Sequence, residues 1–196
     1  MLGHVLLGCS ILLGVVFTVS TASKVRDRTS FVAFIRSVWQ LRLLPDRWVS
    51  SVATGVVAAE AVVPVALLVG HVGVLLDGWS PWRALVAAGL GLGLLLLLVF
   101  TAVIVRATRQ GIRAACRCFG SSGAPLGMRH VVRNVLLAAL ATTGAVVALG
   151  AEQGSVGPLG SVVAAAAGAL LALVFVVFDD MVELFVPSSI ASQPVD

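Results

Sequence analysis

Two of the three cysteines in this chain of 196 residues stand one residue apart, in the segment ACRCFGSSG at 115–123. Cys116 and Cys118 are close enough to form a disulfide, and the small ring that it would close is strained and easily reduced. Arg117 between them and Arg129 nearby would favour the thiolate, which is the reactive form. The spacing therefore indicates a redox pair of the kind that a thiol-disulfide oxidoreductase uses, and it leaves open whether the chain is itself an enzyme.

Glu60 is the second residue whose type suggests chemistry, because it is the only acid inside the long apolar stretches of the chain. A carboxyl group deep in a bilayer costs about 3 kcal/mol or more, so such residues are usually functional. When protonated, Glu60 could donate a hydrogen bond to a quinone carbonyl or relay protons, and Arg133 and Asn134 could complete a quinone pocket. The alternative is structural: Glu60 bonds to a neighbouring helix or pairs with Arg133.

The composition says what kind of protein must position these residues. Hydrophobic residues make up 59% of the chain, charged residues 11%, and the mean hydropathy is +1.08. These values lie far outside the range of soluble globular proteins and predict an integral membrane protein whose main partner is the lipid bilayer. The net charge of +4 does not indicate a nucleic-acid partner, because the Lys and Arg residues lie between apolar runs, where they set orientation.

Five apolar stretches are long enough to cross a bilayer as helices. They lie at about 5–22, 50–76, 84–105, 131–150 and 159–178. We therefore expect an all-α, polytopic membrane helical bundle. Its domains would be a four-helix core in residues 1–150, an additional transmembrane helix in 151–180 and a polar C-terminal tail at 181–196.

Three local patterns refine this plan. No Lys or Arg precedes the first stretch, so we do not expect it to be a cleaved signal peptide. Apolar residues recur at helical spacing within 31–39, which suits a short helix lying in the membrane interface. Gly89 and Gly93 form a small-xxx-small pair that would let a neighbouring helix approach closely.

The basic residues predict the orientation of the helices. Residues 23–48 and 106–130 are rich in Lys and Arg, whereas 71–83 hold a single Arg. By the positive-inside rule, both basic segments face the cytoplasm. We therefore expect a multi-pass protein of the cell membrane with its N-terminus outside and its C-terminus and the Cys116–Cys118 loop in the cytoplasm. Lys24, at the end of the first stretch, would extend its amine to that surface. Alternatively, Lys24 could line a polar pocket under the cysteine loop together with Arg133 and Asn134.

The cysteine pair has two other interpretations. A tetrahedral zinc site needs four ligands, and His130 is the only other His or Cys expected on the same side, so we expect no metal. The pair could also be incidental, but such tight spacing in a chain with three cysteines makes chance the weaker explanation. Cys9 has no partner at helical spacing and is expected to be a small packing residue.

Three segments together resemble the MauE family of methylamine-utilisation membrane proteins, within the wider DoxX-like group. They are AAEAVVPVALLVG at 58–70, CRCFG at 116–120 and RHVVRNVLLAAL at 129–140. The resemblance covers residues 5–150 and implies the four-helix core. Where family members often have a small residue between the cysteines, this chain has Arg117, which makes the loop more cationic.

The resemblance implies a role in the maturation of the disulfide-rich small subunit of methylamine dehydrogenase, alongside a thioredoxin-like partner. Cys116 and Cys118 would be the thiol pair, and Glu60 matches the acidic position of the family's second helix. The exported, disulfide-containing enzyme would be the client. A non-catalytic scaffold for an oxidoreductase, and a DoxX-like subunit linked to quinone, are the alternatives.

Overall fold

The computed structural model describes residues 1–43, 45–110, 128–150 and 157–185, and all regular structure within these ranges is α-helical. The helices are α1 (Leu2–Val25), α2 (Arg28–Gln40), α3 (Asp46–Asp77), α4 (Trp79–Arg109), α5 (Met128–Leu149) and α6 (Pro158–Phe185). Within the same ranges, α1, α3, α4, α5 and α6 are long and apolar enough to cross a membrane. The predicted polytopic helical membrane bundle is confirmed.

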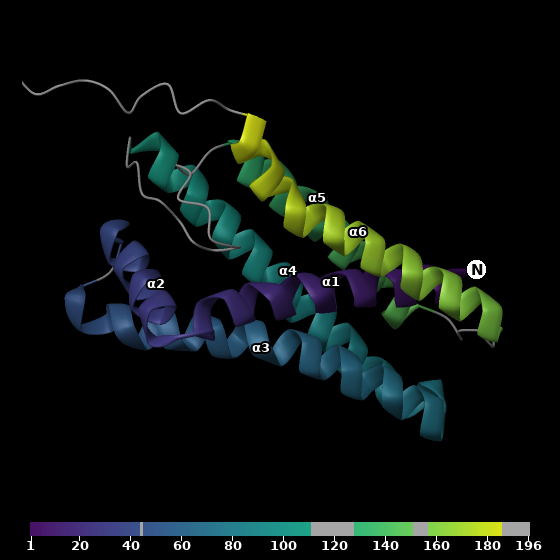
Figure 1. Cartoon of the computed structure of the whole chain (residues 1–196). Coiled ribbons are helices and arrows are strands. Elements are labelled where there is room, and N and C mark those ends of the chain that lie inside the picture. Colours follow the sequence, from purple (N-terminus) through teal and green to yellow (C-terminus); the bar gives the residue numbers. More distant parts are fainter. Residues whose placement is uncertain (44, 111–127, 151–156, 186–196) are drawn as a thin grey trace, which may run out of the picture.

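Helix α1 lies in the middle of the bundle (Figure 1). It packs against α3, α5 and α6, while α4 packs against α3 and α5. Leu13, Val16 and Phe17 of α1 are completely buried. Because α1 is apolar on all sides, it can bury each of its faces against a different neighbour, as a central helix must.

Glycines set how closely these helices approach. A Cβ atom on Gly89 would lie 3.1 Å from the side chain of Leu67 in α3, and one on Gly93 would lie 3.3 Å from the ring of Phe17 in α1. A Cβ atom on Gly168 in α6 would lie only 2.5 Å from the carbonyl oxygen of Gly8. The packing role predicted for Gly89 and Gly93 is confirmed, and α6 docks on α1 by the same means.

A leucine at Gly93 is therefore expected to destabilise the bundle, since overpacked side chains typically cost about 1 to 3 kcal/mol. Gly91 in the same helix is the matched control, because no heavy atom lies within 4 Å of a Cβ built there. Thermal unfolding of the detergent-solubilised protein should show a lower midpoint for Gly93→Leu and a nearly unchanged midpoint for Gly91→Leu. Equal losses in both variants would contradict this account of the packing.

The short helix expected within 31–39 is present as α2. It begins at Arg28 and is capped by Asp27, whose carboxylate accepts hydrogen bonds from the hydroxyl of Thr29 and from the backbone N–H of Ser30 at 2.6 Å. These hydrogen bonds lower the pKa of Asp27 to about 2, and the bond from the Thr29 hydroxyl contributes most. The charged cap fixes where the helix starts.

Helix α2 also packs on the rest of the protein. Phe34 is buried against Ala53 and Val57 of α3. After α2 ends, Leu41 is buried against Ala107 of α4. Because these contacts reach two spanning helices, α2 covers one end of the bundle.

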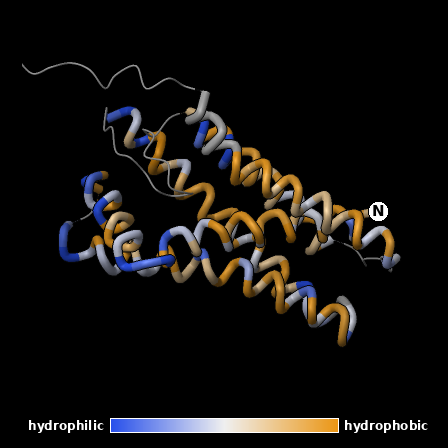
Figure 2. Tube along the Cα trace, viewed as in Figure 1, coloured by the Kyte–Doolittle hydropathy of each residue, from blue (hydrophilic) through white to orange (hydrophobic). Residues whose placement is uncertain are grey.

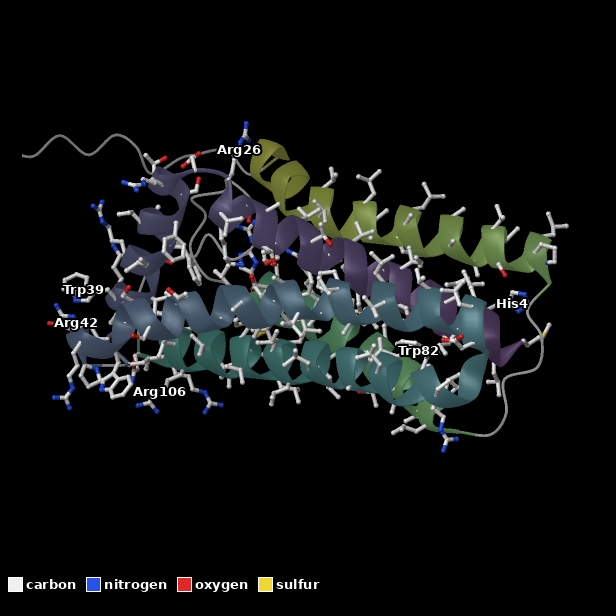
Figure 3. All side chains as sticks on the ribbon, turned by 90° about the horizontal axis from the view of Figure 1, so that it is seen from below. His4, Arg26, Trp39, Arg42, Trp82 and Arg106 are labelled. Atoms are coloured by element: carbon white, nitrogen blue, oxygen red, sulfur yellow. The ribbon has the colours of Figure 1, made fainter. Side chains whose placement is uncertain are left out.

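Hydrophilic residues gather at this end (Figure 2), where α1 ends, α3 begins, α4 ends and α5 begins. Arg26, Arg42 and Arg106 lie there, whereas His4 lies at the opposite end (Figure 3). We call this the α2 end of the bundle. It is the end for which the positive-inside rule predicts a cytoplasmic location.

Candidate functional site

A buried ion pair links α1 to α3 near the α2 end. The amine of Lys24 lies 2.9 Å from Oε1 and 2.8 Å from Oε2 of Glu60. The Lys24 side chain is 1% exposed and that of Glu60 is fully buried. Both oxygens of the carboxylate therefore accept a hydrogen bond from one cation, which is the arrangement that stabilises a charge removed from water.

Ser20 completes the hydrogen bonding of the pair. It stands one turn before Lys24 in α1, and positions four apart share a helix face. The Lys24 amine donates to the Ser20 hydroxyl at 2.7 Å, and that hydroxyl donates to Oε1 of Glu60 at 3.3 Å. We call Ser20, Lys24 and Glu60 the polar triad.

Helix α2 covers the triad. The Lys24 amine lies 5.3 Å from the centre of the Phe34 ring, within the range of a cation–π interaction. Phe34 is itself 3% exposed and packs on α3. The aromatic ring thus separates the amine from solvent and ties α2 to both α1 and α3.

The position of Lys24 corrects the expectation from the sequence. We expected its amine to extend to the membrane surface, but the side chain turns inward and is buried, because Glu60 offers it a carboxylate within the bundle. The cation considered for Glu60 was Arg133, whereas the structure provides Lys24. Glu60 therefore lies opposite the last turn of α1, nearer the α2 end than a central position.

Arg133 and Asn134 of α5 are also buried, at 4% and 3% exposure. Their level follows from a contact elsewhere on α5: a Cβ atom on Gly144 would lie 3.3 Å from the Cβ atom of Cys9. Helices α1 and α5 run in opposite directions. Arg133 precedes Gly144 by as many residues as Ser20 follows Cys9, so Arg133 lies at the same depth in the bundle as Ser20. Three helices therefore contribute buried polar side chains at one depth, and we call this the polar layer.

The cysteine pair itself lies outside the described residues, as does Arg117. The ends of its segment are described: α4 ends at Arg109 and α5 begins at Met128, both at the α2 end. Chain connectivity therefore attaches the segment with Cys116 and Cys118 to the same end as the polar layer. Cys9 is buried in α1 with a free thiol, in keeping with the packing role expected for it.

The family model described as "Methylamine utilisation protein MauE" matches residues 2–149. The chain belongs to the MauE family. The match covers the polar layer and the cysteine segment, and it ends where α5 ends, so α6 lies beyond it.

No match was found among curated proteins or among solved structures. Membership of the MauE family and the five apolar helices together identify a multi-pass membrane protein associated with methylamine utilisation. The sequence pattern did not indicate Ser20 as a site residue, nor Lys24 as the partner of Glu60. The signal was present, since a lysine near the end of an apolar helix and an acid inside the next one invite a charge pair.

Proposed function

We propose that this MauE-family protein is a membrane thiol-disulfide relay that supports disulfide formation in an exported enzyme, such as a methylamine dehydrogenase small subunit. Cys116 and Cys118 would be the redox pair, and a thioredoxin-like protein would carry electrons from the client. The observation that supports this most is the polar layer, which lies at the end of the bundle where the cysteine segment joins α4 to α5.

The proposed reaction begins with a Cys116–Cys118 disulfide. A thiolate of the thioredoxin-like partner attacks one sulfur, breaking that disulfide and forming a mixed disulfide. The second thiolate of the partner then attacks the partner's own sulfur in the mixed disulfide and displaces the relay cysteine as a thiolate, so the partner leaves as a disulfide and both relay cysteines become thiols. Two electrons and two protons have passed to the relay, and the oxidised partner is ready to accept electrons from its client.

Reoxidation needs a two-electron acceptor, and we propose a quinone. The two thiols would become a disulfide again while the quinone takes up two electrons and two protons to become a hydroquinone. Arg133 and Asn134 carry N–H donors that suit a quinone oxygen, whereas both oxygens of Glu60 already accept hydrogen bonds from Lys24 and Ser20. In this proposal, Glu60 holds Lys24 in place and the donors on α5 contact the quinone.

The cations near the cysteines have a defined role in this chemistry. Arg117 lies between Cys116 and Cys118, and Arg129 is in the first turn of α5. Positive charge near a thiol favours the thiolate, which is both the attacking and the leaving form in disulfide exchange. The arginines would therefore speed each exchange with the partner.

The second candidate is a non-catalytic scaffold for an oxidoreductase. The polar triad favours it, because a carboxylate with all its partners supplied by α1 can serve simply to hold two helices together. In this case the cysteines would be dispensable to the partner. The two candidates therefore differ in what happens when one cysteine is removed.

A trapped mixed disulfide would separate these candidates. In a Cys9→Ser background, Cys116→Ser or Cys118→Ser leaves one thiol that can join to the thioredoxin-like protein but cannot resolve the bond. We expect one of the two variants to accumulate a reducible covalent complex with that partner, seen on a non-reducing gel. A relay would be contradicted if both variants remained uncoupled while the partner bound normally.

The orientation of the relay is part of the proposal. The basic residues favour a cytoplasmic location for the cysteine segment, although an exported client is oxidised outside. A relay that passes reducing equivalents across the membrane would reconcile the two, as would a cysteine loop folded back into the bundle. The test applies a membrane-impermeant maleimide to intact cells that carry the Cys9→Ser variant. Cys116 and Cys118 should stay unlabelled until the cells are opened. Labelling from outside would contradict the proposed orientation.

A further inference from the structure

A recess beside the last two turns of α4 is not used by the proposed relay. It has a volume of about 510 Å³ and is lined by Ala102, Val105, Arg106, Arg109 and Gln110. Along α4, the apolar residues Ala102 and Val105 come before Arg106, Arg109 and Gln110. The recess therefore changes from apolar to cationic along the helix axis, toward the α2 end.

The two arginines are available to a ligand. Arg106 and Arg109 are both exposed and stand three residues apart, so their side chains emerge on neighbouring positions of one helix face. Neither takes part in an ion pair within the described ranges, where the salt bridge present is that of Lys24 with Glu60. Two adjacent guanidinium groups offer the paired N–H donors that suit a phosphate.

The surroundings place this recess at the level of lipid headgroups. Trp39 and Trp48 are about half exposed, at 49% and 54%. Trp39 lies at the same end of the molecule (Figure 3), and Trp48 stands in the first turn of α3, which begins there. Exposed tryptophans at the end of a membrane bundle are typical of the membrane–water interface. Arg42 is exposed nearby with a left-handed backbone, φ 50°, directly after Leu41 packs on α4.

We propose that this recess binds an anionic phospholipid, with Arg106 and Arg109 donating hydrogen bonds to the phosphate and with Ala102 and Val105 contacting the first part of an acyl chain. The order of groups selects a lipid over a soluble anion, because a free phosphate would use the arginines and leave the apolar part empty. Basic pockets at the ends of spanning helices are suited to such headgroups.

The test uses the full chain, purified in a neutral detergent, and native mass spectrometry with added phosphatidylglycerol or phosphatidylcholine. The wild type should retain phosphatidylglycerol at least tenfold more tightly than phosphatidylcholine. Arg106→Gln with Arg109→Gln should remove that preference, and Arg106→Lys with Arg109→Lys should keep part of it. Arg83→Gln is the control, since it removes an arginine charge from the other end of α4.

Each further result decides for or against the proposal. Loss of the preference in Arg83→Gln as well as in the double glutamine variant would overturn it, because a general charge effect would then suffice. Inorganic phosphate at equal concentration should not displace phosphatidylglycerol, and full displacement would mean a site for free anions. The lysine double variant is a check on misfolding, and if it unfolds as the glutamine double variant does, Ala102 is changed instead. The proposal is then supported if Ala102→Gly keeps the preference for phosphatidylglycerol and Ala102→Trp loses it. It is overturned if both Ala102 variants keep the preference.

Discussion

Replacing Glu60 with leucine while Lys24 remains is expected to destabilise the protein by about 3 to 5 kcal/mol, because the buried charge of Lys24 loses its carboxylate partner. The Lys24 amine is 1% exposed and donates to both oxygens of Glu60. Without them it would retain the Ser20 hydroxyl, a neutral acceptor at 2.7 Å. Thermal unfolding in detergent should show the loss, and Lys24→Met should produce a loss of similar size.

The double variant Lys24→Met with Glu60→Leu is the matched control. Replacing both members of a buried pair with apolar residues is often neutral for stability, so we expect most of the loss to be recovered. The two single losses should then sum to much more than the loss in the double variant. If the double variant were as unstable as both singles added together, the ion pair would not be the reason for the instability.

The same double variant also separates structure from function. If the polar layer takes part in the relay, the double variant should be stable, but its Cys116 and Cys118 should be reoxidised slowly. If the triad only joins α1 to α3, the stable double variant should be fully active. Activity and stability are measured on one preparation, so a folding defect cannot be mistaken for a chemical one.

Changing Cys116 and Cys118 together to serine is expected to reduce disulfide formation in the exported client to its uncatalysed level. A serine hydroxyl cannot form the disulfide through which the two electrons pass. The measurement is the fraction of client with complete disulfides, from alkylation and mass spectrometry. Cys9→Ser is the matched control, because Cys9 is a buried packing residue in α1, and it should leave the fraction near the wild-type value.

The opposite result would support the scaffold. If the double serine variant matured its client fully while deletion of the whole protein did not, the membrane bundle and not its thiols would be required. The two serines are close in volume to the cysteines that they replace. Loss of the protein from the membrane is therefore not expected, and its amount should be checked by immunoblot.

Much of the fold was predictable because it depends on the length and periodicity of apolar runs. Long stretches without charge must form helices in a bilayer, where each backbone group needs an internal partner. The short helix α2 followed from apolar residues at helical spacing within 31–39, and the close approach at Gly89 and Gly93 followed from their spacing. These features are local in the sequence, so no knowledge of neighbouring helices was required.

The polar triad was not predictable in the same way. Glu60 could be selected as a buried acid, but the choice of Lys24 over Arg133 depends on the register between α1, α3 and α5. That register is set by contacts such as that of Gly144 in α5 with Cys9 in α1, which belong to helices far apart in the chain. A sequence pattern shows which residues are costly to bury, whereas the three-dimensional packing decides which of them meet.

The central claim is that Cys116 and Cys118 cycle between dithiol and disulfide while the client is oxidised. It is tested most directly by their redox state in living cells, fixed by acid and read by alkylation with a mass tag. We predict that wild-type cells contain both forms and that removing the thioredoxin-like partner shifts the pair towards the disulfide, since its electron donor is gone. A pair that stays fully reduced, with and without that partner, would contradict the relay.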